Sequence, residues 1–304
     1  MSRWAYPEED DDFLAGRILA SDSILSFQRD LMIPLAHVIL QRTSQGMTWS
    51  GLENIDHSPT LFISNHRDIV LDAYLLQVIL LENGFETSQI IAGANLYVNG
   101  FVEDVATCNK IIAIGRGGSK RGFGEQMMHI SSVLRGSLAP HDGQGSSVWI
   151  AQRNGRTKNR IDKTDPSIIH MLSMTGSIAD YRIVPVTITY EIEPNAQYKA
   201  RHLWHLENPE TTADEDYMEQ MLGSILQPKG HIHYTFHKPL DLAADSMSPK
   251  EYYQTVAQRI DDAILGGYRK WVAEPAVESQ WQQLCADAPH KLLPYMQVFA
   301  PQYL

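Results

Sequence analysis

The chain has 304 residues, of which 43% are hydrophobic and 20% are charged, a composition typical of a globular protein. Its formal net charge of -11 argues against a nucleic-acid binder, because such proteins usually present a basic surface. The two cysteines, Cys108 and Cys285, form neither a disulfide framework nor a zinc-binding spacing, which indicates a reducing compartment.

The N-terminal stretch "MSRWAYPEEDDDF" is acidic and lacks the apolar core of a signal peptide. No uninterrupted apolar run reaches the roughly 18 residues that a membrane-spanning helix needs. We therefore expect a cytoplasmic protein that is either soluble or peripheral on the inner face of the cytoplasmic membrane.

The predicted elements alternate between strands and helices along most of the chain. Residues 1–46 form a predicted N-terminal helical segment, with helices over 12–43 that break near Pro34. The core, residues 47–240, has predicted strands and helices in turn. The strands are expected at 47–55, 60–65, 89–94, 110–116, 146–153, 182–191 and 230–240, and the helices at 68–84, 122–136 and 166–179.

A further helix is predicted at 248–273, within a C-terminal helical extension over 241–304. Strands that alternate with helices favour a parallel sheet covered on its faces. The prediction is thus a single α/β domain over 1–304, with a largely parallel central sheet flanked by helices and extra helices at both termini.

The first candidate site is the junction "SNHRDIVLD", which follows a predicted strand, where open α/β sheets bind ligands. His66 would take a proton from a substrate hydroxyl, and Asp68 or Asp72 would hold the ring in one tautomer. The alternative is an ordinary helix start, in which Asp68 caps the helix and His66 is a polar loop residue.

The second candidate site is "GRGGSKRG" at 115–122, which places cations among glycines. Glycine backbone N–H groups approach anions closely, and cations neutralise them. The sequence fits neither a P-loop nor a dinucleotide-binding motif. A solvated basic loop is the alternative.

The third candidate site is "QRNGRTKNR" at 152–160, where Arg153, Arg156, Lys158 and Arg160 crowd a chain that is otherwise acidic. Two arginines that grip one phosphate would explain such a concentration of charge. An exposed cationic turn is the alternative.

Other patterns in the sequence argue against a metal site and against a serine or cysteine nucleophile. Pro185 inside the predicted strand 182–191 implies an edge strand or a bulge. His231 and His233 share one face of a strand but lack a third ligand, so no metal is expected. No GxSxG elbow is present, and neither cysteine has the basic surroundings of a thiol nucleophile.

Taken in order, these junctions resemble the glycerolipid acyltransferase superfamily, over about residues 60–191. "SNHRDIVLDAYLL" resembles its first block, Asn-His-(four residues)-Asp, and "AGANLYVNGFVEDVATCNKIIAIGRGGSKR" is similar to its second. "VWIAQRNGRTKNR" resembles the third block, and "IVPVTITYE" is similar to the fourth, an apolar strand with an inner proline.

The resemblance implies transfer of a fatty acyl group from acyl-CoA or acyl-carrier protein to glycerol-3-phosphate or 1-acylglycerol-3-phosphate. His66 would be the general base, with no covalent acyl-enzyme and no cofactor. The implied phosphate ligands are Arg116, Arg153, Arg156 and Lys158. The implied oxyanion or substrate loop consists of Gly115, Gly117, Gly118, Asn154 and Gly155. Peripheral membrane contact through the first helices or the aromatic tail is expected, and no nucleic-acid partner.

Two positions depart from the family pattern. The family acid lies five residues after the histidine, where this chain has Leu71. Alignment of the following Asp-Ala-Tyr-Leu-Leu favours Asp72 as the partner of His66, with one residue inserted, and leaves Asp68 as the helix cap. The glutamate of the third block is also missing, with Asn154 as a substitute, so the acceptor stays open. Another lipid acceptor, or a non-catalytic lipid- or phosphate-binding module on the same scaffold, remains an alternative.

Overall fold

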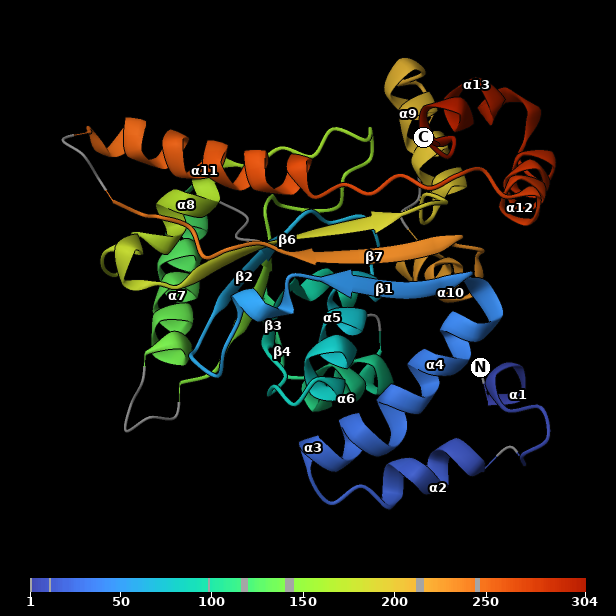
Figure 1. Ribbon diagram of the computed structural model, residues 1–304, viewed down its shortest axis with the longest axis horizontal. Coiled ribbons are helices and arrows are strands. Elements are labelled where there is room, and N and C mark those ends of the chain that lie inside the picture. Colours follow the sequence, from blue (N-terminus) through green and yellow to red (C-terminus); the bar gives the residue numbers. More distant parts are fainter. Residues whose placement is uncertain are drawn as a thin grey trace.

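The computed structural model describes residues 2–10, 12–97, 99–115, 120–139, 145–211, 216–243 and 247–304. Its centre is a seven-stranded sheet in the order β1-β7-β6-β2-β5-β3-β4 (Figure 1). All neighbouring strands pair in parallel except β6 and β7. The prediction of an α/β fold with a largely parallel sheet is therefore confirmed. The strands are β1 (Gly46–Ser50), β2 (Leu61–Ser64), β3 (Gln89–Gly93), β4 (Ile111–Ile114), β5 (Val148–Ala151), β6 (Ile183–Tyr190) and β7 (His231–Phe236).

The two central strands are buried along their whole length. Every residue of β2 and β6 is buried, as expected for strands inside a sheet that is covered on both faces. In the register of the sheet, Ser64 at the end of β2 aligns with Ala151 at the end of β5. The segments that follow these two strands therefore leave the sheet side by side.

Helices cover both faces of the sheet (Figure 1). One apolar cluster packs α4 (Ile33–Thr43) and α5 (Leu71–Glu82) on the face that contains Phe62. A second cluster packs α7 (Lys120–Leu138), α8 (Pro166–Leu172) and α11 (Pro249–Gly266) on the face that contains Leu61 and Ile63. Neighbouring residues of β2 thus enter opposite layers, because side chains alternate along a strand.

A third apolar cluster lies outside these two layers. It is built by α9 (Ala196–Glu207), α12 (Pro275–Ala286) and α13 (Leu293–Met296). Two helices, α9 and α10 (Tyr217–Leu226), interrupt the chain between β6 and β7. The sequence did not predict these two helices or α6 (Gly100–Cys108). In α9 only Ala196, Lys199 and Ala200 are buried, which is too few for a clear apolar period.

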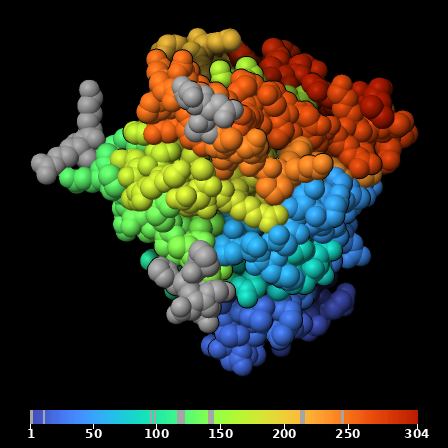
Figure 2. All heavy atoms as spheres, turned by 60° about the vertical axis from the view of Figure 1, so that its left-hand side comes forward, coloured from blue at the N-terminus to red at the C-terminus, as the bar shows by residue number. Residues whose placement is uncertain are grey.

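The N-terminal helices differ from the expectation in one respect. The chain forms α1 (Ser2–Ala5), α2 (Phe13–Leu19) and α3 (Ile24–Phe27), and then runs through the π-helical turn η1 (Gln28–Met32) into α4. The predicted break near Pro34 is wrong, because the chain stays helical from Ile24 to Thr43; the irregularity is the π-helical turn that ends two residues before Pro34. Figure 2 shows these helices and the C-terminal ones at opposite ends of the molecule.

For Pro185, predicted to lie in an edge strand or at a bulge, the edge position is wrong, because β6 lies between β7 and β2. The carbonyl of Pro185 accepts a hydrogen bond from the His237 N–H at 3.0 Å. The regular pairing of β6 with β7 extends only as far as Val186 and Phe236, so Pro185 lies one residue outside it. The missing N–H of Pro185 lies on the same side as this carbonyl, toward the segment after β7, so no hydrogen bond to β2 is lost.

Candidate active site

His66 and Asp72 are brought together where β2 passes into α5. The imidazole Nδ1 of His66 and the Oδ2 of Asp72 are 2.8 Å apart. The Asp72 side chain is 1% exposed and that of His66 is 18% exposed. A buried carboxylate thus holds a histidine that still reaches the surface, as a base and its orienting acid require.

Asp72 is fixed by further donors. Its Oδ2 accepts the backbone N–H groups of Arg67 at 2.6 Å and Asp68 at 2.9 Å, and its Oδ1 accepts the Tyr190 hydroxyl at 2.9 Å. Burial, together with Asp72, raises the pKa of Tyr190, so its hydroxyl stays protonated and donates. Because Nδ1 of His66 donates to this carboxylate, the lone pair of the neutral ring lies on Nε2.

Asp68 has a different task. Its Oδ1 accepts the N–H groups of Val70 at 2.8 Å and Leu71 at 2.7 Å, which lie at the start of α5, and also the Ser224 hydroxyl from α10. It therefore satisfies donors that the helix itself leaves open. The structure pairs His66 with Asp72 and gives Asp68 the helix start, the arrangement that the sequence favoured. The catalytic role of either residue stays a prediction.

The third candidate segment lies against the His66 loop. The N–H of Gln152 donates to the carbonyl of Ser64, and the N–H of Thr157 donates to the carbonyl of His66, both at 2.8 Å. Between them, Asn154 and Gly155 are exposed, and Gly155 has a φ of +72° that favours glycine. The structure thus brings together the first and third junctions of the sequence analysis.

The ring of Trp149 in β5 packs beside the imidazole of His66. The two rings meet edge-on, with centroids 5.7 Å apart and planes at 78°. The indole N–H donates to the Ser64 hydroxyl at 2.9 Å, which holds the ring in place. Within the described part of the chain, no hydrogen-bond partner lies at Nε2 of His66, whereas Nδ1 binds Asp72.

The cations of the third segment have unequal surroundings. Arg156 is buried, donates to Gln220 in α10, and lies 5.4 Å from the ring centroid of Tyr198 in α9. The ammonium of Lys158 is 5.6 Å from the same ring centroid. These two predicted phosphate ligands therefore contact helices that the sequence did not predict.

Arg160 and Arg153 complete the segment. Arg160 donates to the carbonyl oxygens of Val298 at 3.2 Å and Ala300 at 2.7 Å, so it ties the loop to the C-terminal segment. Arg153 is partly exposed, and no acceptor among the described residues binds its guanidinium. Arg153 thus differs from Arg156 and Arg160, whose guanidinium groups donate to protein acceptors.

The second candidate segment is described only in part. Gly115 is exposed just after β4, and the predicted Arg116, Gly117 and Gly118 lie outside the described residues. In the sheet, β5 and β3 separate β4 from β2. The structure as described therefore does not join this segment to His66.

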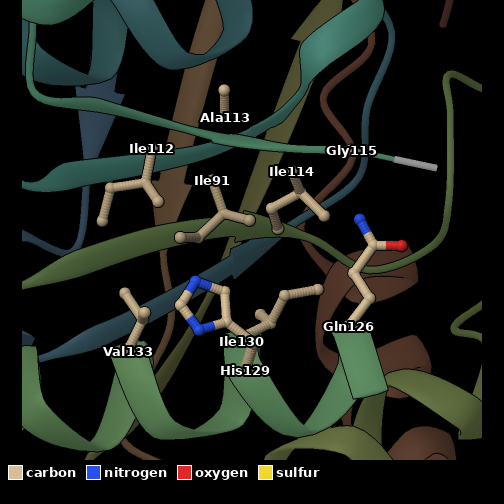
Figure 3. A pocket seen from close by; sticks show the side chains of 9 residues that line it. All are labelled: Ile91, Ile112, Ala113, Ile114, Gly115, Gln126, His129, Ile130 and Val133. Carbon is tan, nitrogen blue, oxygen red and sulfur yellow. The ribbon is translucent and has the colours of Figure 1, made fainter. Parts of the chain in front are cut away.

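A small apolar pocket lies beside β4. Figure 3 shows Ile112 and Ile114 of β4 pointing toward α7, while Ala113 points away. Ile130 and Val133 of α7 form the opposite wall, and the cavity volume is about 60 Å³. Its lining does not include His66, and its volume is far below the roughly 300–1,000 Å³ of a small-molecule site.

His231 and His233 on β7 are engaged by protein groups. His233 Nδ1 lies 2.7 Å from the Thr48 hydroxyl and its Nε2 3.1 Å from that of Ser50. Nδ1 of His231 lies 2.7 Å from the buried carboxylate of Glu191. Among the described residues, no group of three metal-ligating side chains forms.

The sequence missed the residues behind the histidine. Arg67 extends into the interior, where it binds Asp162 and Glu193, and Lys199 joins them. The position of Arg67 next to His66 was the one feature of the sequence that could have indicated these residues. The partners of Arg67 lie far away along the chain and could not be identified from it. We call Arg67, Asp162, Glu193 and Lys199 the charge cluster.

No family model matches the sequence, and no match is found among curated proteins. Among solved structures, the chain is similar to the 1-acyl-sn-glycerophosphate (LPA) acyltransferase PlsC from Thermotoga maritima, at 12% sequence identity and a TM-score of 0.47. The match covers 86% of this chain and 90% of that one. No helix of the described residues has the length and apolarity to cross a membrane.

Proposed function

We propose that this chain is an O-acyltransferase. It would move a fatty acyl group from acyl-CoA or acyl-carrier protein to a hydroxyl of glycerol-3-phosphate or 1-acylglycerol-3-phosphate. The observation that carries the proposal is the 2.8 Å hydrogen bond between His66 and the buried Asp72, at the carboxyl end of β2. The order of the sequence blocks that resemble the glycerolipid acyltransferases supports the same chemistry.

The proton transfer follows from the ring geometry. The acceptor hydroxyl donates its proton to Nε2 of His66 while its oxygen attacks the thioester carbonyl of the acyl donor. Asp72 stabilises the imidazolium that forms. Collapse of the tetrahedral intermediate breaks the carbon–sulfur bond, and the imidazolium proton passes to the thiolate. No covalent acyl-enzyme is needed.

The basic segment 152–160 would bind the acceptor phosphate. Arg153 is available for a direct contact, because no described residue binds its guanidinium. Arg156 and Lys158 both lie close to the ring of Tyr198 and would add positive charge to the phosphate-binding segment. The roles of Arg116, Gly117 and Gly118 stay predictions, as do those of Gly115, Asn154 and Gly155 in substrate binding.

The proposal is tested by acyl transfer from acyl-CoA, with glycerol-3-phosphate and its 1-acyl form as separate acceptors. We expect His66→Ala to lower kcat by at least about 10²-fold, the usual contribution of general-base catalysis. His129→Ala, which removes an exposed histidine from α7, is the matched control and should keep the wild-type rate.

Equal rates in wild type and His66→Ala would overturn the catalytic proposal. Binding of the phosphorylated acceptor without any acyl transfer would instead favour a lipid- or phosphate-binding module. Peripheral membrane contact also stays a prediction. Flotation of the protein with liposomes tests it, since the proposed product is a lipid.

A further inference from the structure

The charge cluster lies directly behind the His66 loop and holds two cations and two anions. The side chains of Arg67, Asp162, Glu193 and Lys199 are 8%, 1%, 3% and 0% exposed. They come from the segments after β2, β5 and β6 and from α9. Four parts of the chain that are distant in sequence therefore meet at one neutral, buried group of charges.

The hydrogen bonds within the cluster are complete for both carboxylates. Arg67 reaches Asp162 at 2.6 Å and Glu193 at 3.0 Å, and Lys199 reaches the other oxygen of Glu193 at 2.5 Å. The hydroxyls of Thr157 and Tyr268 donate to Asp162. Every carboxylate oxygen thus has a donor, as a buried charged network requires.

The ion pairs with Arg67 and Lys199 keep Glu193 charged. Burial raises the pKa of Glu193, but the charges of Arg67 and Lys199 outweigh this effect and hold that pKa below its usual value. Burial lowers the pKa of Lys199, and Glu193 offsets only part of the change. Buried ion pairs often add no stability over apolar side chains of the same size. Stability therefore does not explain this cluster, and we consider instead how it positions the backbone around it.

Two routes of hydrogen bonds lead from the cluster to the histidine. The Lys199 ammonium donates to the carbonyl of Arg67 at 2.7 Å, and the N–H of Arg67 donates to Asp72, the partner of His66. On the second route, Thr157 donates its hydroxyl to Asp162 and its N–H to the carbonyl of His66. The backbone on both sides of the His66–Arg67 peptide bond is held.

We propose that the charge cluster positions the His66 loop, so that Nε2 of His66 faces the acceptor hydroxyl. This inference rests on the function proposed above. The four members are positioning residues, because their side chains are buried and reach His66 through the Arg67 backbone and Thr157. Loss of one charge would leave its partner uncompensated and let the loop shift.

The test is Glu193→Gln, which keeps the shape of the side chain and removes its charge. We expect kcat to fall about 10²-fold, the effect of a misplacement of about 1 Å at the reacting groups. The KM values of both substrates should change by less than about three-fold, since substrate binding is not disturbed. Glu191→Gln is the matched control, because Glu191 is a buried carboxylate of the same segment that binds His231 instead.

A second readout does not depend on activity. Proton–nitrogen NMR correlations of the His66 ring report which nitrogen carries the proton. In wild type and Glu191→Gln we expect the proton on Nδ1, and in Glu193→Gln a mixture of tautomers. If Glu193→Gln fails to fold, Lys199→Met combined with Glu193→Gln removes one cation and one anion together and leaves Arg67 paired with Asp162.

The outcomes separate this inference from the proposed function. If His66→Ala abolishes transfer but the cluster variant keeps the wild-type kcat and ring tautomer, the inference is overturned and the proposed function stands. If the ring tautomer changes while His66→Ala transfers acyl groups normally, the cluster positions His66 but the proposed function is wrong. Equal losses in the Glu191 and Glu193 variants would indicate a structural effect and overturn the inference.

Discussion

Asp68 and Asp72 are both fully buried and lie four residues apart in the sequence, yet they bind different groups. Asp72 accepts from His66 and from two backbone N–H groups of the preceding loop. Asp68 accepts from the N–H groups of Val70 and Leu71, at the start of α5, and from Ser224. One carboxylate binds the imidazole of His66, and the other binds the start of the helix that carries Asp72.

This division predicts different effects for the two isosteric amides. Asp72→Asn should lower kcat by about 10³-fold, because an amide cannot hold the imidazole in the required tautomer. Asp68→Asn should cost less than about ten-fold, because asparagine is itself a good helix cap. Initial rates at saturating substrate test this, with thermal unfolding as the control. A larger loss in Asp68→Asn would reverse the assignment.

His233 should make the stability of the protein depend on pH. Burial lowers its pKa to about 4, against about 6.5 for a histidine in the unfolded chain. The unfolded state therefore binds a proton more readily between these values, and the folded state loses stability as the pH falls through this window. Above pH 6.5 the ring is neutral in both states and contributes no pH dependence.

His233→Gln keeps a hydrogen-bonding side chain near Thr48 and Ser50 and removes the titration. Between pH 7 and pH 5, we expect the free energy of unfolding of this variant to fall by about 1 kcal/mol less than that of wild type, after allowance for solvent screening. Urea unfolding at both pH values measures the difference. The same decrease in both proteins would contradict the prediction.

At the scale of the elements, the edge strand β1 is bounded by two glycines with different surroundings. Gly46 has a φ of +122° and Gly51 a φ of +81°, both in the region that favours glycine. A Cβ on Gly51 would lie 2.0 Å from the carbonyl oxygen of Phe236, whereas a Cβ on Gly46 would meet no atom within 4 Å. Position 51 therefore requires glycine for two reasons, its positive φ and the close approach of the β7 backbone.

The pair gives a matched test of this contact. Gly46→Ala should lower the free energy of unfolding by about 1 kcal/mol through backbone strain alone. Gly51→Ala should cost about 3 kcal/mol or more, because the strand must also move away from β7. Denaturant unfolding of both variants decides the matter, and equal losses would show that the carbonyl contact is unimportant.

At the scale of the whole molecule, the apolar interior is divided into two layers on the sheet and a third cluster beside it. Leu75 lies in the layer that contains α5, and Phe299 lies in the third cluster, each with 0% exposure. Phe299 stands between Val298 and Ala300, whose carbonyls bind Arg160 of the basic segment. The third cluster is therefore joined to the basic segment by Arg160, in addition to the contacts that α9 makes with Arg156 and the charge cluster.

Truncation of a core side chain should destabilise only part of the molecule in the third cluster, but the whole molecule in the layer that contains α5. Phe299→Ala should expose α12 and α13 to hydrogen exchange, together with the segment around Arg160, and leave β2 and β6 protected. Leu75→Ala should instead lower the stability of the whole molecule by about 2–5 kcal/mol. Hydrogen exchange followed by mass spectrometry tests both variants. Uniform loss of protection in Phe299→Ala would show a single cooperative unit.

The sequence predicted the sheet better than the layer that covers the site. Buried parallel strands such as β2 and β6 appear as continuous apolar runs, so each strand was found near its observed position. The helices α9 and α10 were missed because few of their residues are buried against the sheet. The break near Pro34 and the edge position of Pro185 were wrong, because both depend on what surrounds the proline.

The sequence by itself determined the local parts of the site: a histidine after a buried strand, a capping aspartate, a second aspartate four residues later, and a basic segment after another strand. The types of these residues and their order along the chain are local features, where backbone geometry follows from neighbours within a few residues. Only the tertiary structure decided that Arg67 points inward to Asp162, Glu193 and Lys199, and that Arg160 binds the C-terminal segment. Those contacts join residues roughly a hundred positions apart, so burial and charge compensation in the folded chain select them.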